Sequence, residues 1–391
     1  MQRVELNNFK NKKVALVMSG GVVKAAAWHL GVALAIEELG FTLKNNTSEA
    51  SSLEIGTYVG SSAGALISLY FASGLRPMDI IESHLGAKGA KVRPINYKDM
   101  LSLKKPMKSP VRGGFYDPFD EFPAIIKGFL GPFLRFNGLF STSGLNKYIT
   151  DEIILSNDFK DYLADLFIVA TQLDHSRKCI FSKYKYPSPH HDSTASYYTD
   201  IPVSDSVAAS MSVPPFYSPY PIKNPVTNQV DYYIDGEIRE TLSTHVAVDN
   251  RCDFIISSWT HTPYHYHDEI GSLVNYGLPA ISTQAIYLMI QKKIVESRAR
   301  KANNVDIINT VNDYMKSNKF SNEHRKKLVS ILERKLNHNP NIHFIDIYPK
   351  HENYRLFFQN SFSLNPDKMS RLVTLGYKRT MEVFRNHEWE S

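Results

Sequence analysis

The feature that most constrains this chain is a pattern that occurs twice near its beginning, in which a short apolar run is followed by a glycine-containing turn and a long apolar segment. The run Val14–Met18 ends in a Ser-Gly-Gly turn and precedes an apolar segment at 25–39, and the run 55–59 precedes the apolar segment 62–72. Short apolar runs between turns are typical of buried strands, and segments apolar nearly all round are typical of core helices. This alternation predicts an α/β fold with a mainly parallel sheet covered by helices on both faces.

Later segments continue the pattern. We expect three more buried strands at 166–173, 254–257 and 342–348, and Asn365-Pro366 places an N-cap residue and a proline where a closing helix begins. The length of 391 residues fits one large α/β domain with insertions as well as two or three domains.

Composition excludes several classes of protein. A hydrophobic content of 43% argues against a disordered chain, and two cysteines, Cys179 and Cys252, exclude a disulfide scaffold and a four-cysteine zinc site. No run of about 20 apolar residues predicts a transmembrane helix, and the first residues lack the apolar core of a signal peptide. We expect a cytoplasmic or peripheral membrane protein, with export without a cleaved signal left open.

Positive charge is concentrated in two regions. Residues 88–112 carry eight Lys or Arg against one acidic residue, and residues 291–340 carry twelve against five. The first region leads into a stretch with seven Phe and one Tyr between Phe115 and Phe140. Cationic and aromatic side chains together fit an interfacial lipid-binding lid, whereas phenylalanines alone fit a buried packing subdomain. We therefore predict that 84–140 is an insertion and a lid or membrane-docking element.

The strongest chemical motif is Gly60-Ser61-Ser62-Ala63-Gly64. It follows a predicted strand and opens a predicted helix, which is the context that a nucleophile elbow requires. The turn would expose the hydroxyl of Ser62, and side chains at Gly60 and Gly64 would collide with the neighbouring strand and helix. The helix N-terminus favours negative charge that develops at the serine.

A second motif, Ser19-Gly20-Gly21-Val22-Val23-Lys24, ends the first strand. Adjacent glycines allow backbone amides to converge on an anion, either an oxyanion or a phosphate. The sequence lacks the P-loop pattern and the three glycines of a dinucleotide fingerprint. Because a candidate nucleophile exists, an oxyanion hole is the better interpretation.

Asp235, which precedes Gly236, is the candidate general base. It ends a strand-like run at 232–234 that could place its carboxylate beside Ser62. An ordinary aspartate pKa of about 3.9 makes a poor base at neutral pH, so the role requires burial. A histidine triad is the other possibility, with His261, His265 or His267 as the third member. A metal site at 264–268 is a weaker interpretation.

These motifs together resemble the patatin-like phospholipase family. The resemblance rests on SGGVVKAAAWHLGV, on GSSAG about forty residues later and on DGEIRETLSTHVAV. The segments AASMSVPPFYSP, GLFSTSGLNKYI and SRLVTLGYKRTMEVF agree with it, so that it spans roughly 12–386 and is weakest at 84–137 and 262–340.

The resemblance implies a three-layer α/β/α sandwich and hydrolysis of lipid acyl esters by a Ser–Asp dyad that needs no metal or cofactor. By motif matching, Ser62 is the nucleophile, Asp235 is the base, and the amides of Gly20, Gly21 and Val22 form the oxyanion hole. Lys24 stands at the family's usual Arg/Lys position and is a candidate for binding an anion or head group. The implied domain covers 12–386, with the insertion 84–140 and a basic helical segment at 262–340 inside it.

Two departures from the family pattern affect the expected activity. The family usually has glycine where Val22 and Ala25 stand, and Glu237 replaces a glycine often found after Asp-Gly. A β-branched residue at a position of positive φ would strain or reshape the oxyanion loop.

The expected function is hydrolysis of phospholipid or lysophospholipid esters at an anionic membrane surface, with any activating partner unknown. An esterase with a Ser-Asp-His triad and a weakly active lipid- or partner-binding module are the competing hypotheses. Nucleic-acid binding lacks a recognised motif and is not expected.

Overall fold

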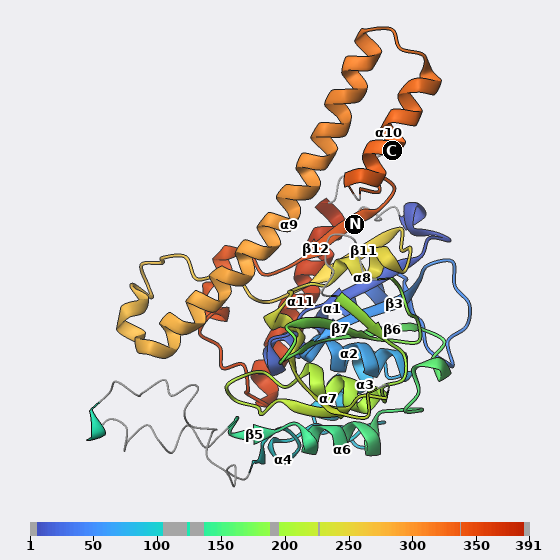
Figure 1. Cartoon of the computed structure of the whole chain (residues 1–391). Coiled ribbons are helices and arrows are strands. Elements are labelled where there is room, and N and C mark those ends of the chain that lie inside the picture. The colour runs from blue at the N-terminus through green and yellow to red at the C-terminus, as the bar shows by residue number, and fades with distance from the viewer. Residues whose placement is uncertain are drawn as a thin grey trace.

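The computed structural model describes residues 6–104, 123–125, 137–187, 195–225, 227–336 and 338–386. About half of the predicted insertion at 84–140, residues 105–122 and 126–136, lies outside these residues. In the described part, a ten-stranded sheet forms the centre of the molecule (Figure 1). Its main path runs in the order β12-β11-β1-β3-β6-β10-β9.

The strands of this sheet are short. They are β1 (Val14–Met18), β2 (Thr42–Leu43), β3 (Glu54–Ser61), β6 (Asp165–Gln172), β7 (Arg177–Phe181), β8 (Ala195–Tyr198), β9 (Tyr220–Lys223), β10 (Val230–Asp235), β11 (Phe254–Ser258) and β12 (His343–Ile347). The bounds of β1, β3, β6, β10, β11 and β12 are close to those of the predicted runs, whereas β2, β7, β8 and β9 were not predicted. A separate two-stranded sheet joins β4 (Ser102–Leu103) to β5 (Phe140–Ser141).

The centre of the sheet is parallel, as predicted. Strand β1 pairs in parallel with β3 and β11, and β3 pairs in parallel with β6. Strand β10 pairs with β6 and β9 in the antiparallel sense, and β7 is also antiparallel to β6. This antiparallel part was not predicted, because period-2 patterns in short strands are weak.

Helices cover both faces of the sheet. The α-helices are α1 (Val22–Glu38), α2 (Ala63–Ala72), α3 (Pro77–His84), α4 (Tyr97–Met100), α6 (Ser143–Glu152), α7 (Val203–Ser210), α8 (Thr244–Asp249), α9 (Gly277–Ser317), α10 (Asn322–Leu336) and α11 (Pro366–Asn386). Short 3-10 helices are η1 (Leu6–Phe9), η3 (Phe159–Asp161), η4 (Gly236–Ile238), η5 (Leu273–Tyr276) and η6 (His351–Leu356).

Alternate residues of β1 show how the layers are divided. Leu16 and Met18 belong to the larger apolar cluster, which includes side chains of α1, α2 and α11. Ala15 and Val17 belong to a second cluster with side chains of α8 and α9. Successive side chains of a strand point to opposite faces, so the central sheet separates two helical layers. The predicted three-layer α/β/α sandwich is confirmed.

Helix α11 packs directly against α1. A Cβ atom built on Gly31 of α1 would lie 2.0 Å from the Val373 carbonyl oxygen, and one on Gly376 would lie 2.4 Å from that of Trp28. Only glycine therefore permits this close approach. The C-terminal helix thus completes the layer that contains α1 and α2.

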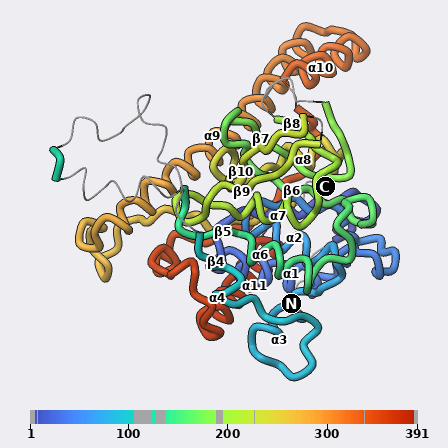
Figure 2. The backbone as a smooth tube through the Cα atoms, turned by 60° about the horizontal axis from the view of Figure 1, so that its bottom comes forward, coloured from blue at the N-terminus to red at the C-terminus, as the bar shows by residue number. Residues whose placement is uncertain are grey.

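Helices α9 and α10 form a hairpin that extends away from the sheet. Figures 1 and 2 show α9 leaving the body of the molecule and α10 returning beside its far end. The first part of α9 contacts the core through Ile290 and Ile294, and the amide of Asn304 donates to the Leu336 carbonyl across the hairpin. No described helix is long and apolar enough to cross a membrane.

Candidate active site

Two turns meet at one edge of the sheet. Strand β1 leads into the Ser-Gly-Gly turn before α1, and β3 leads directly to Ser62 before α2. The two strands are parallel neighbours, with Met18 opposite Gly60, so their carboxyl ends lie side by side. A Cβ atom on Gly20 would lie 2.8 Å from Cβ of Ser62 and 3.3 Å from its Oγ. The glycine turn and the serine therefore belong to one site.

Ser62 occupies a sharp turn between strand and helix. Its φ of 52° and ψ of −120° are unusual for a residue with a side chain. A Cβ atom on Gly60 would lie 2.3 Å from the Gly64 carbonyl oxygen, and one on Gly64 would lie 2.2 Å from that of Met18. The turn can therefore form only with glycine on both sides of Ser62.

A buried hydroxyl supports the backbone of this turn. The amide of Ser62 donates to Oγ of Ser210 at 2.8 Å, and that hydroxyl donates to the Val169 carbonyl at 2.6 Å. Sequence reasoning did not single out Ser210, although it lies in the segment AASMSVPPFYSP. Its role depends on contacts between α7, β6 and the turn, which no local pattern records.

Asp235 reaches the same site from the other side of β6. In the sheet Ser61 lies opposite Val169, and the next residue of β6, Ala170, lies opposite Asp235. The buried carboxyl accepts a hydrogen bond from the Glu237 amide at 2.8 Å, and an interaction with the Ser62 side chain favours its ionised form. A Cβ atom on Gly236 would lie 2.3 Å from the Val169 carbonyl oxygen, which explains the glycine after this aspartate.

Burial changes the acidity of Asp235. Loss of water raises its pKa to about 6, although the interaction with Ser62 and the hydrogen bond from the Glu237 amide act in the opposite direction. A carboxylate with this pKa is mostly ionised at pH 7 and is a better proton acceptor than an exposed aspartate.

The turn between β1 and α1 has a left-handed backbone. Gly21 has a φ of 127° and Val22 a φ of 56°. Positive φ is a strained conformation for a β-branched residue, so the substitution noted in the sequence occurs at a position that favours glycine. Among the described residues, the amides of Gly21 and Val22 have no hydrogen-bond acceptor.

Glu237 accepts a hydrogen bond from the third amide of this turn, that of Gly20. The amide of Gly20 donates to Oε1 of Glu237 at 2.9 Å, and the side chain is buried. Burial and then the negative charge of Asp235 raise the pKa of Glu237 to about 8. The sequence showed the glutamate but not its contact with Gly20, which lies 217 residues away.

Lys24 lies beneath the turn and is only 2% exposed. Its Nζ donates to the Tyr287 hydroxyl at 2.7 Å and lies 5.0 Å from the centre of that ring. The neighbouring His261 is neutral at pH 7, because burial and then the charges of Lys24 and His29 lower its pKa to about 3. A positive charge thus lies behind the glycine turn, where it favours anions.

Of the candidate triad histidines, His265 and His267 lie away from the site, whereas His261 lies beside the glycine turn. The ring of His265 contacts that of His351, and the ring of His267 stacks on Tyr354. Nε2 of His261 would lie 3.4 Å from a Cβ atom on Gly21. No hydrogen bond joins any histidine of the described ranges to Ser62 or Asp235. In the same ranges, no group of three or more His, Cys, Asp or Glu could hold a metal ion.

The comparison with known families agrees with this geometry. A family model described as patatin-like phospholipase matches residues 16–248, which is more than half of the chain and includes the glycine turn, Ser62 and Asp235. No curated protein matches the chain. The family acts on lipid substrates, so the match supports lipid acyl hydrolase or esterase activity in general. The chain belongs to the patatin-like phospholipase family.

Proposed function

We propose that this protein hydrolyses acyl esters of phospholipids or lysophospholipids with a dyad of Ser62 and Asp235. The observation that carries the proposal is that Ser62, held in a strained turn, interacts with the buried carboxyl of Asp235, whose pKa burial raises to about 6. A nucleophile and a base within hydrogen-bond reach are the first requirement for covalent catalysis.

In the first half of the reaction, Oγ of Ser62 attacks the ester carbonyl while Asp235 accepts the serine proton. The carbonyl oxygen becomes an oxyanion, which the free amides of Gly21 and Val22 and the N-terminus of α2 stabilise. The Gly20 amide joins them when Glu237 releases it. Lys24 adds positive potential from behind the turn. Asp235 then donates its proton to the leaving alcohol, and an acyl-enzyme remains.

In the second half, Asp235 accepts a proton from water, and the resulting hydroxide attacks the acyl-enzyme. The same amides stabilise the second oxyanion. The bond to Oγ breaks, Ser62 regains its proton from Asp235, and the fatty acid leaves. The cycle consumes only the ester and water.

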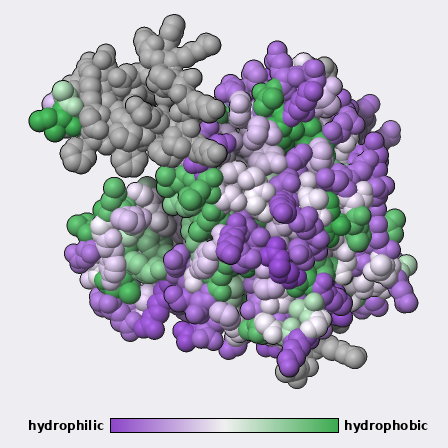
Figure 3. Space-filling view, turned by 90° about the horizontal axis from the view of Figure 1, so that it is seen from below, coloured by the Kyte–Doolittle hydropathy of each residue, from purple (hydrophilic) through white to green (hydrophobic). Residues whose placement is uncertain are grey.

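We also propose that the reaction occurs at an anionic membrane surface. The first part of α9 exposes apolar side chains at helical spacing, namely Leu278, Ile281, Leu288 and Met289. Figure 3 shows hydrophobic atoms gathered on the lobe that this part of the chain forms. Lys292 and Lys293 follow in the same helix, within a region of twelve basic and five acidic residues at 291–340. Apolar burial together with cationic attraction is what binds a helix to anionic lipid. The insertion at 84–140 is proposed as a second docking element or lid.

The test is release of fatty acid from vesicles of phosphatidylcholine and phosphatidylglycerol, with and without chelator. We expect release by the wild type, unaffected by chelator, and a loss of at least about 1,000-fold in Ser62→Ala and Asp235→Asn. Ser68→Ala is the matched control for the serine, because this buried hydroxyl of α2 has no partner among the described residues. Asp231→Asn is the control for the base, since it lies in the same strand.

Two observations favour a weakly active lipid-binding module as the second candidate. Val22 is strained in the oxyanion turn, and Glu237 holds the Gly20 amide. Vesicle binding by the wild type, with no fatty acid released and no effect of Ser62→Ala, would support that function and contradict the hydrolase.

A further inference from the structure

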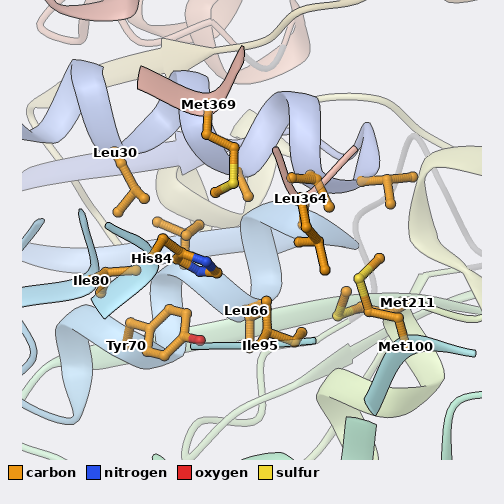
Figure 4. A pocket seen from close by; sticks show the side chains of 15 residues that line it. Leu30, Leu66, Tyr70, Ile80, His84, Ile95, Met100, Met211, Leu364 and Met369 are labelled. Carbon is orange, nitrogen blue, oxygen red and sulfur yellow. The ribbon is translucent and has the colours of Figure 1, made fainter. Parts of the chain in front are cut away.

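A cavity lies between the helices of one layer, and Ala63, the residue after Ser62, is part of its lining. Fifteen side chains line it, and only Tyr70 and His84 among them carry polar atoms (Figure 4). One end includes Val22 of the oxyanion turn, Ala63 beside the nucleophile and Met211 beside Ser210. This end of the cavity therefore lies beside the place where an ester carbonyl would be attacked.

The two principal walls show the direction of the cavity. Val23, Ala26 and Leu30 line it from α1, and Ala63, Leu66 and Tyr70 line it from α2. Both sets recur every three or four residues, so each occupies one face of its helix. At a rise of 1.5 Å per residue, seven or eight residues span about 10–12 Å. Figure 4 shows Met211 near one end and Leu30, Tyr70 and Ile80 towards the other.

The cavity is narrow. The unfilled space, including the open mouth, is about 470 Å³, but the centre of a water molecule can move through only about 40 Å³ of it. This width suits one unbranched chain. Met100, Met211 and Met369 lie along the wall, and methionine side chains adapt easily to an entering ligand.

The deep end offers no charge to an occupant. The Tyr70 hydroxyl is hydrogen-bonded to that of Tyr148 at 2.8 Å, so the cavity faces mainly its ring. Burial lowers the pKa of His84 to about 4, and its imidazole is therefore neutral at pH 7. A hydrocarbon chain fits these surroundings, whereas a phosphate head group would lose its hydration without gaining a partner.

We infer that this cavity, called here the acyl cavity, receives the acyl chain of the substrate, and that Leu30, Tyr70 and Ile80 limit its length. The inference rests on the proposed function for the position of the ester at Ser62. Carbon–carbon bonds of about 1.5 Å advance an extended chain by about 1.3 Å each, so the cavity holds roughly eight to nine carbons. The substrate class is thus an ester of a straight, medium-length fatty acid.

The first test compares p-nitrophenyl acetate, butyrate, octanoate and palmitate. For the wild type, we expect kcat/KM to rise up to octanoate and to fall for palmitate. Ala26→Leu narrows the middle of the cavity, so it should lower kcat/KM at least about 10-fold for octanoate and less than twofold for acetate. Ile80→Ala should shift the preference towards longer chains. Ala302→Leu, at an exposed position of α9, is the matched control and should behave as wild type.

The second test separates the cavity from the chemistry. Calorimetry should detect binding of one decanoate molecule to the Ser62→Ala protein and a loss of at least about 10-fold in affinity when Ala26→Leu is added. If no ester is hydrolysed but decanoate binds in this manner, the proposed function fails and the cavity assignment stands. If esters are hydrolysed, the inference is overturned by equal losses on acetate and octanoate in Ala26→Leu, or by unchanged decanoate binding.

Discussion

The backbone amide of Gly20 donates a 2.9 Å hydrogen bond to Oε1 of Glu237. Glu237 thus binds one of the three backbone amides that are expected to stabilise the oxyanion. An amide that donates to a carboxyl group is not free to donate to a substrate, so the resting site offers the amides of Gly21 and Val22 alone. Glu237 also contacts the proposed base, because its backbone amide donates a hydrogen bond to the Asp235 carboxyl. It therefore interacts with both the base and the oxyanion turn.

Replacing Glu237 by glycine should activate the enzyme. Glu237→Gly frees the Gly20 amide, and one oxyanion donor affects kcat by about 100- to 1,000-fold in well-studied hydrolases. We expect a smaller gain, of about 10-fold in kcat/KM for p-nitrophenyl octanoate, because the strain at Val22 remains. Glu237→Gln keeps an acceptor for the amide and is the matched control. Equal activity of both variants and the wild type would show that Glu237 does not obstruct the turn.

The pH profile of kcat/KM should be bell-shaped. Asp235 must be ionised to accept a proton, so activity should rise as the pH increases through about 6. Glu237 ionises near pH 8, and its negative charge would then oppose the oxyanion, so activity should fall above that pH. Glu237→Gln cannot ionise and should lose the alkaline limb alone. A profile that keeps this limb in Glu237→Gln contradicts the assignment.

The same group should make stability depend on pH. The folded chain raises the pKa of Glu237 from 4.5 to about 8, so it holds this proton more tightly than the unfolded chain does. The resulting stabilisation is fully present below about pH 4.5 and is lost as the pH rises towards 8. Glu237→Gln avoids this loss.

Urea unfolding at pH 5 and pH 8.5 measures the difference. We expect the free energy of unfolding to fall less in Glu237→Gln than in the wild type, by about 1 kcal/mol or more, since one pKa unit corresponds to about 1.4 kcal/mol. Glu82→Gln, at an exposed position of α3, should leave the pH dependence unchanged. An identical loss in the wild type and Glu237→Gln would contradict this account.

The exposed stripe of α9 should control membrane binding. Leu278→Glu with Met289→Glu replaces two exposed apolar side chains of this stripe by carboxylates, and both side chains are more than half exposed. Sedimentation with phosphatidylglycerol vesicles should show at least about 10-fold weaker binding, while hydrolysis of soluble p-nitrophenyl butyrate stays within twofold. Val305→Glu with Tyr314→Glu, further along α9, is the matched control. Unchanged vesicle binding by the Leu278 and Met289 variant would exclude this stripe.

Much of the fold follows from local patterns in the sequence. The run Val14–Met18 is a strand with the same bounds in the structure, and the Asn365-Pro366 signal marks the start of α11. Helix α1 begins at Val22 rather than Ala25, because the glycine turn ends earlier than the apolar pattern indicates. Strands β7 and β8 were missed, since their pairing with β6 arises from long-range contacts.

The candidate site likewise has a part that the sequence predicts and a part that it does not. Ser62 and Asp235 could be identified from motifs, because each motif is contiguous. The hydroxyl of Ser210, the contact of Glu237 with Gly20 and the acyl cavity join segments far apart in the chain. Only the folded arrangement brings them together, so no local signal could have predicted them.

The central claim is that Asp235 activates Ser62. The most direct measurement is the rate at which a fluorophosphonate labels the protein at pH 7, with the modified residue identified by mass spectrometry. The account predicts a single adduct on Ser62 in the wild type and in Asp231→Asn, and labelling at least about 100-fold slower in Asp235→Asn. Absence of an adduct on Ser62, or equal rates in the wild type and Asp235→Asn, would contradict it.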